Sequence, residues 1–154
     1  MSNMMKVRTL YIPEILDLVE AAKTKEAKIK ILHDNRSTAL GVMLAYTYDD
    51  RYKFILSTKE VDLVLGQKTK KTFDIMGTSP THLYREYSRF GLFVVGQGTV
   101  VPKEKLMEML AQLREAINPL EFEVVIKMMK KQPLTPSLTV DLLKEAFPSL
   151  LPKD

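Results

Sequence analysis

The most informative stretch of this 154-residue chain is Thr38-Ala-Leu-Gly-Val-Met-Leu-Ala-Tyr-Thr47. Wound into a helix, it is apolar on nearly every side, and such helices belong in a protein interior. Ser37 precedes it as a predicted N-cap, and Asp49-Asp50-Arg51 follows it as a predicted stop and turn. We therefore predict that residues 38–47 form the central buried helix.

Helical patterns continue outward in both directions. Thr24 predicts the cap of a helix that runs to Asn35, and Asn118-Pro119-Leu-Glu121 is the clearest helix start, with Asn as cap, Pro in the first turn and Glu in a capping role. Further helices are predicted over 13–23, 80–90, 102–117, 118–131 and 135–147. Brief polar links join these segments. The predicted fold class is all-α, with residues 1–154 forming a single domain built as a compact bundle or short solenoid of six to seven helices.

Residues 57–79 do not share this helical period. Two short apolar runs, Val61–Leu65 and Thr72–Met76, flank a basic segment, residues 66–71. Periodicity does not distinguish a strand from a helix in runs this short. The region is predicted to be either a β-hairpin with a basic tip or a mobile insertion, and a loop of this length is more often functional or disordered than neutral.

The composition excludes several kinds of chemistry. With no cysteine, the chain has no disulfide, thiol nucleophile, iron–sulfur cluster or thiolate zinc site. Its first residues lack the apolar run of a signal peptide, and no window approaches the ~18 apolar residues of a membrane span. We expect a soluble protein of a reducing compartment, without a membrane partner.

The positive charge is concentrated rather than uniform. Lys and Arg number 23 against 19 Asp and Glu, a net charge of +4. Residues 23–36 carry five basic and two acidic residues, and 5 − 2 accounts for +3 of that total. A candidate basic patch in this segment consists of Lys23, Lys25, Lys28 and Lys30. Such lysines contact phosphates or an acidic partner, or simply form a solvated helix face.

Catalytic or metal-binding constellations are not evident in the sequence. His82 and Glu86 have the i, i+4 spacing of a helical pair but no further ligand nearby, so a partly solvated pair is predicted. The adjacent carboxylates Asp49 and Asp50 fit a helix stop better than a catalytic pair, and Glu121 is assigned to capping. Phosphate loops and nucleophile elbows are also missing. We predict that the protein is not an enzyme and holds no metal or cofactor.

Two groups of residues are candidates for partner binding. The helix expected at 80–90 interleaves aromatic and basic side chains, although its aromatic residues also fit a core stripe. Methionines on two successive helices, among them Met107, Met109 and Met128, either fill the core or form an adaptable surface. The candidate partner-binding set is Lys68, Lys70, Lys71, Tyr84, Arg85 and Arg89.

The order of these motifs resembles an uncharacterised family of small proteins from large contractile-tailed bacteriophages (myoviruses). The residues that carry the resemblance are Lys25-Glu-Ala-Lys-Ile-Lys-Ile-Leu32, Ser37-Thr-Ala-Leu40 with Tyr48-Asp-Asp-Arg-Tyr52, Leu83-Tyr-Arg-Glu-Tyr-Ser-Arg-Phe90 with Leu92-Phe93-Val94, Asn118-Pro119, Leu134-Thr135 and Lys144-Glu-Ala-Phe-Pro148. Residues 57–79 depart from the shorter, proline-rich linker expected there. The resemblance implies a phage origin and a helical fold, but it transfers no activity and no site.

Taken together, these features predict a non-enzymatic phage protein in the cytoplasm of the infected bacterial host. It would bind a host or phage protein complex as a host-takeover factor or inhibitor, for example of a host protease, transcription factor or defence factor. The alternative is a basic nucleic-acid-binding accessory protein of phage replication or transcription. A capsid or tail component is a third possibility, and the sequence gives no oligomeric state.

Overall fold

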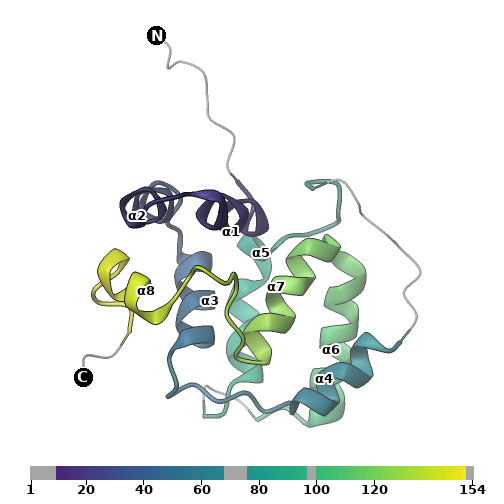
Figure 1. The fold of residues 1–154 in the computed structure, drawn as a ribbon. Coiled ribbons are helices and arrows are strands. Elements are labelled where there is room, and N and C mark those ends of the chain that lie inside the picture. Colours follow the sequence, from purple (N-terminus) through teal and green to yellow (C-terminus); the bar gives the residue numbers. More distant parts are fainter. Residues whose placement is uncertain (1–9, 68–75, 97–99, 152–154) are drawn as a thin grey trace.

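The structure, a computed structural model, describes residues 10–67, 76–96 and 100–151, and this part of the chain is all-α (Figure 1). Its elements are α1 (Ile12–Ala21), α2 (Lys25–Asp34), α3 (Thr38–Tyr48), α4 (Thr58–Leu65), α5 (Leu83–Glu86), the 3-10 helix η2 (Tyr87–Phe93), α6 (Lys103–Ala116), α7 (Pro119–Met129) and α8 (Val140–Ala146). The predicted all-α class is confirmed. The helices outnumber the six to seven predicted because one of them lies in residues 57–79.

The most deeply buried helix is α7, which packs against α1, α3, α4 and α6. Its buried residues are Glu121, Phe122, Val124, Val125, Ile126, Met128 and Met129. The segment predicted as the central buried helix is indeed a helix, α3, and it packs against α7. However, Val42, Ala45 and Tyr46 of α3 remain half-buried. The apolar circumference of α3 therefore exceeds what its neighbours cover.

The remaining helices flank this pair on two sides. On one side, α1 packs against α2, and α2 packs against α8. On the other side, α4 packs against α6, and both contact α7. Figure 1 shows α2 and α8 at the edge near α3, and α4 and α6 at the opposite edge. Side chains from all of these elements join one apolar core cluster.

The predicted helix starts are largely correct because their capping side chains make the expected bonds. Thr24 Oγ1 accepts the Ala27 amide at 3.1 Å, and Ser37 Oγ accepts the Leu40 amide at 3.1 Å. Asn118 Oδ1 accepts the Leu120 amide at 2.8 Å. Each bond satisfies an amide that the helix itself leaves without a partner.

Replacing Thr24 with alanine should lower the free energy of unfolding by about 1 kcal/mol, because α2 then loses its N-terminal side-chain cap while the exposed site tolerates the smaller residue. Urea denaturation measures the change. Thr24→Ser keeps the hydroxyl, so its free energy of unfolding should remain close to that of the parent protein. Equal losses of stability in Thr24→Ala and Thr24→Ser would show that the stability depends on the Thr24 methyl group and not on the cap.

Residues 57–79 differ from both sequence predictions in the part that the structure describes. Val61–Leu65, predicted as a hairpin strand, belongs to α4, which begins with a capping box between Ser57 and Glu60. Val61 and Val64 face the core, and α4 packs on α6. Helix α4 has eight residues, about two turns, and this is too few for its hydrophobic period to be recognised in the sequence. Residues 68–75, which include all of the second predicted strand except Met76, lie outside the described residues.

The region around residue 80 also differs from its prediction. The helix expected from Ser79-Pro80 begins at Leu83 and changes at Tyr87 into a 3-10 helix that ends at Phe93. Beyond it, Val94 forms an isolated antiparallel bridge with Phe54. Ser79 Oγ instead donates to the Thr81 carbonyl at 2.8 Å, which holds a turn rather than a helix start.

Candidate functional site

The aromatic residue of the predicted partner-binding set, Tyr84, is engaged within the chain. Its hydroxyl donates to the carbonyl of Leu10, and its ring lies near the rings of Tyr11 and His82, at centroid distances of 6.5 and 6.1 Å. Burial raises the pKa of Tyr84 to about 12. Tyr84 thus ties α5 to the residues that begin α1.

The two arginines of that set, Arg85 and Arg89, are exposed. Arg89 forms an ion pair with Glu86 at 3.6 Å, and the other oxygen of Glu86 accepts the Thr81 hydroxyl at 2.8 Å. The predicted His82–Glu86 pair is therefore wrong. Glu86 contacts Arg89 and Thr81 instead, and His82 Nδ1 is buried without a hydrogen-bond partner among the described residues.

Next to this ion pair lies a half-enclosed cavity of about 220 Å³ between η2 and α6. Side chains that line it are Thr81, Glu86, Arg89, Phe90, Phe93, Met109, Gln112, Leu113 and Ala116. The floor is apolar, since Phe90 and Phe93 belong to the buried core, whereas Glu86, Arg89 and Gln112 supply polar groups. Sequence reasoning picked out Arg89 and Met109 separately, but only the packing of η2 on α6 brings them to one cavity.

Three of the four lysines of the predicted basic patch make contacts within the chain. Lys28 Nζ donates to the Val19 carbonyl at 2.7 Å and to Ser137 Oγ at 3.1 Å. Lys25 pairs with Glu145 of α8 at 3.1 Å, and Lys30 pairs with Asp34 at 2.8 Å. Lys23 is exposed, and no partner is recorded for it in the described part of the chain. Lys68, Lys70 and Lys71 lie outside the described residues.

The adjacent carboxylates Asp49 and Asp50 do not converge. The side chain of Asp49 is 1% exposed and accepts two bonds from the Arg51 guanidinium, from Nε at 3.1 Å and from NH2 at 2.8 Å. These bonds hold the pKa of Asp49 below its ordinary value. Asp50 is exposed to solvent. The predicted helix stop is confirmed, because Asp49 is the C-cap residue of α3.

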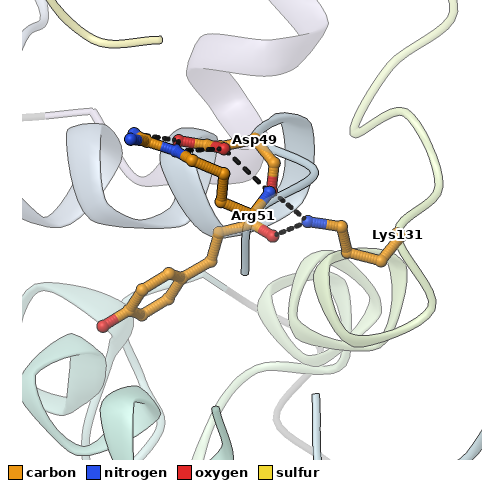
Figure 2. Close-up of polar contacts among 4 residues, drawn as sticks. Asp49, Arg51 and Lys131 are labelled. Atoms are coloured by element: carbon orange, nitrogen blue, oxygen red, sulfur yellow. Dashed lines mark hydrogen bonds and ion pairs between the residues drawn. The ribbon is translucent and has the colours of Figure 1, made fainter. Parts of the chain in front are cut away.

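Lys131 completes this arrangement from the far end of α7 (Figure 2). Its Nζ donates to the carbonyls of Tyr46 and Asp49 at 2.6 and 2.8 Å. Burial lowers the pKa of Lys131, while the nearby Asp50 and Asp49 carboxylates oppose that effect. The carbonyls that Lys131 contacts lie at the C-terminal end of α3, although Lys131 itself follows the end of α7.

Sequence reasoning missed the role of Glu121. Its side chain does not cap its own helix: Oε2 accepts the amide of Leu83, the first residue of α5, at 3.3 Å. The residue has no exposed surface. Burial, to which the Glu14 carboxylate adds, raises the pKa of Glu121 to about 7, although the Leu83 hydrogen bond opposes the rise. Nothing in the motif Asn118-Pro119-Leu-Glu121 signals this role, because the same motif encodes an ordinary capping box.

Two structural findings bear on the function classes considered. Across residues 10–67, 76–96 and 100–151, His, Asp and Glu side chains form no group of three or more arranged to hold a metal ion. Among those same residues, no helix is long and apolar enough to cross a membrane.

The fold and the cavity define a small all-α protein with a half-enclosed apolar recess beside its core. The chain belongs to a family of unknown function (DUF6433), whose model matches residues 15–135. The match runs from α1 through α7, so α8 lies outside it. No curated protein and no solved structure matches the chain.

Proposed function

We propose that this protein is a non-enzymatic binding module and that its partner is a protein of a host or phage complex. The cavity between η2 and α6 carries the proposal. At about 220 Å³ it lies below the ~300–1,000 Å³ of typical ligand and cofactor sites, so it suits a single inserted side chain. Protein interfaces concentrate their binding energy in such anchors, seated in well-packed pockets.

The polar groups at the cavity complement an anchor with an apolar body and a polar tip. Phe90, Phe93 and Met109 offer apolar and adaptable surface, while Arg89 and Gln112 offer hydrogen-bond donors. The side chain of Arg89 is 70% exposed, and its 3.6 Å contact with Glu86 is weak enough to exchange for a partner group.

The internal contacts of the α2 lysines weigh against the nucleic-acid alternative. Lys28 uses two of its three N–H donors in hydrogen bonds to Val19 and Ser137. Lys25 and Lys30 each pair with a carboxylate. Phosphate binding at these positions would first break those contacts. A host-takeover or inhibitor function requires a phage origin and a location in the cytoplasm of the infected cell. Both rest on the sequence resemblance.

The proposal predicts that the parent protein captures one protein, in stoichiometric amount, from host or infected-cell lysate. Blocking the cavity should abolish this capture. Gln112→Trp places a bulky ring at the cavity wall, and its recovery of that protein should fall roughly tenfold or more, as for the loss of an interface anchor. Gln132→Trp is the matched control, because Gln132 is also exposed but does not line this cavity. Recovery by the Gln132→Trp control should equal recovery by the parent protein. Nuclease treatment should not change either.

Three results would contradict the proposal. An empty lane from both lysates would exclude a host or phage target. Equal capture by Gln112→Trp and the parent protein would show that the cavity is not the contact. Recovery that disappears with nuclease, together with binding to random-sequence DNA that weakens steeply with salt, would favour the nucleic-acid alternative.

A further inference from the structure

Two buried carboxyl groups, Asp49 and Glu121, have opposite surroundings. Asp49 faces the guanidinium of Arg51, which compensates its negative charge. Glu121 is the more deeply buried, at 0% exposure against 2%. The groups that act on its carboxyl, within the described residues, are the Leu83 amide and the carboxylate of Glu14, and no cation is among them. An isolated buried carboxylate next to a second one is strongly disfavoured.

Glu121 lies where the starts of three helices meet. Its Oε2 accepts the Leu83 amide at the start of α5, and Glu14 belongs to the first turn of α1. The other titratable side chains at this junction are Tyr11, His82 and Tyr84, which are phenols or an imidazole. None of the groups acting on the Glu121 carboxyl comes from α3, α4 or α6, the other helices packed against α7.

Hydrogen bonding at the junction is incomplete. Glu121 Oε1 and His82 Nδ1 are the buried side-chain atoms of the described residues that have no hydrogen-bond partner. Ionised, Oε1 is a charged buried acceptor without a donor; protonated, it is an uncharged buried hydroxyl, whose missing hydrogen bond costs less than a buried unpaired charge. The surroundings therefore fit the protonated form.

We propose that Glu121 is a pH-sensitive latch: while its carboxyl carries a proton, the starts of α1, α5 and α7 pack together, and loss of that proton loosens this junction. Once ionised, the carboxylate has no counter-charge to pair with in the part of the chain that the structure describes, so hydration through separation of the helices is the available response. The Tyr84–Leu10 bond, which links α5 to the residue before α1, lies in the part that would loosen. The latch is independent of the proposed binding function.

The direction of the pH effect follows from the raised pKa of Glu121 in the folded protein. The ordinary value is 4.5 and the folded value is about 7, so the folded state holds the proton more tightly than the unfolded chain. The stabilisation is fully present below about pH 4.5 and is lost as the pH rises through about 7. Across this window, the unfolding equilibrium constant should rise on the order of a hundredfold from this group.

Amide hydrogen exchange at about pH 5.5 and about pH 8.5, corrected for intrinsic exchange rates, tests the latch. In the parent protein, protection of the Leu83 amide and of the second turn of α1 should fall at the higher pH, and by more than protection in α8. Glu121→Gln should keep its protection at both pH values. Glu123→Gln, an exposed site on the same helix, should behave like the parent.

A second measurement, infrared spectroscopy, detects the protonated carboxyl group directly. In the difference between the spectra of the parent and of Glu121→Gln at the lower pH, the infrared carbonyl band of a protonated carboxyl should be present. If Glu121→Gln does not fold, Glu14→Gln serves instead: with its carboxylate neighbour removed, the loss of protection should move to lower pH. The latch is wrong if the difference spectrum lacks that band, if Glu121→Gln keeps the pH-dependent loss, or if Glu14→Gln leaves its midpoint unchanged.

Discussion

Replacing Lys131 with methionine is expected to lower the free energy of unfolding by about 3 kcal/mol. Methionine keeps an unbranched apolar stem but removes the ammonium group that donates to the carbonyls of Tyr46 and Asp49. The last carbonyls of a helix have no partner within the helix, so Lys131 supplies a donor to Tyr46 and a second donor to Asp49, whose carbonyl also accepts the Tyr52 amide at 3.1 Å. Each such bond to a charged group stabilises a protein by about 1.5–3 kcal/mol. Urea denaturation at neutral pH measures the loss.

Two companion variants separate the ammonium group from the backbone. Lys127→Met, at an exposed position of the same helix, should change the free energy of unfolding by no more than about 0.5 kcal/mol. Lys131 has a φ of 57°, a left-handed conformation that costs a side-chain-bearing residue about 1–2 kcal/mol. Lys131→Gly should therefore be roughly 1 kcal/mol more stable than Lys131→Met. If Lys131→Met is as stable as Lys127→Met, the ammonium group does not hold α3.

The second large effect is expected for Met128→Ala, which should destabilise the protein by about 2–5 kcal/mol. Met128 is among the largest fully buried side chains and lies on α7, the helix with four helical neighbours. Truncation loses the buried surface and leaves a space that the surrounding helices fill only in part. Thermal and urea unfolding should both show the loss.

Met107→Ala is the matched comparison, because Met107 of α6 is only half-buried. Its cost should be about 1 kcal/mol, as expected from the smaller apolar area involved. Similar losses at Met107 and Met128 would mean that burial in α7 does not explain the effect. The pair also divides the methionines: Met128 and Met129 belong to the core, whereas Met107 and Met109 keep accessible surface.

Much of the fold could be predicted from the sequence because its signals are local. Capping by Thr24, Ser37 and Asn118 depends on residues two or three positions away, so the pattern contains all the partners of the bond. The prediction failed where the local signal is short or ambiguous. Helix α4 has too few residues to show a period, and Ser79-Pro80 matches a helix start although Ser79 forms a turn.

The candidate site could be predicted only in fragments. Arg89 and Met109 stood out for separate reasons, yet nothing in the chain shows that residues twenty positions apart line one cavity. The lysines of α2 formed a convincing patch in sequence, but their partners, Ser137 and Glu145, come from the far end of the chain. Charge counts cannot reveal those contacts, because they record composition and not proximity.

The sequence determined the secondary structure class, most helix boundaries and the absence of thiol chemistry, since these follow from residue types and from contacts within a few positions. The tertiary structure alone decided that α7 rather than α3 is most enclosed, that Lys131 donates to the end of another helix, and that Glu121 has no counter-charge among the described residues. The physical reason is shared by all three. Burial and electrostatic surroundings depend on which helices pack together, and those neighbours are distant in the chain.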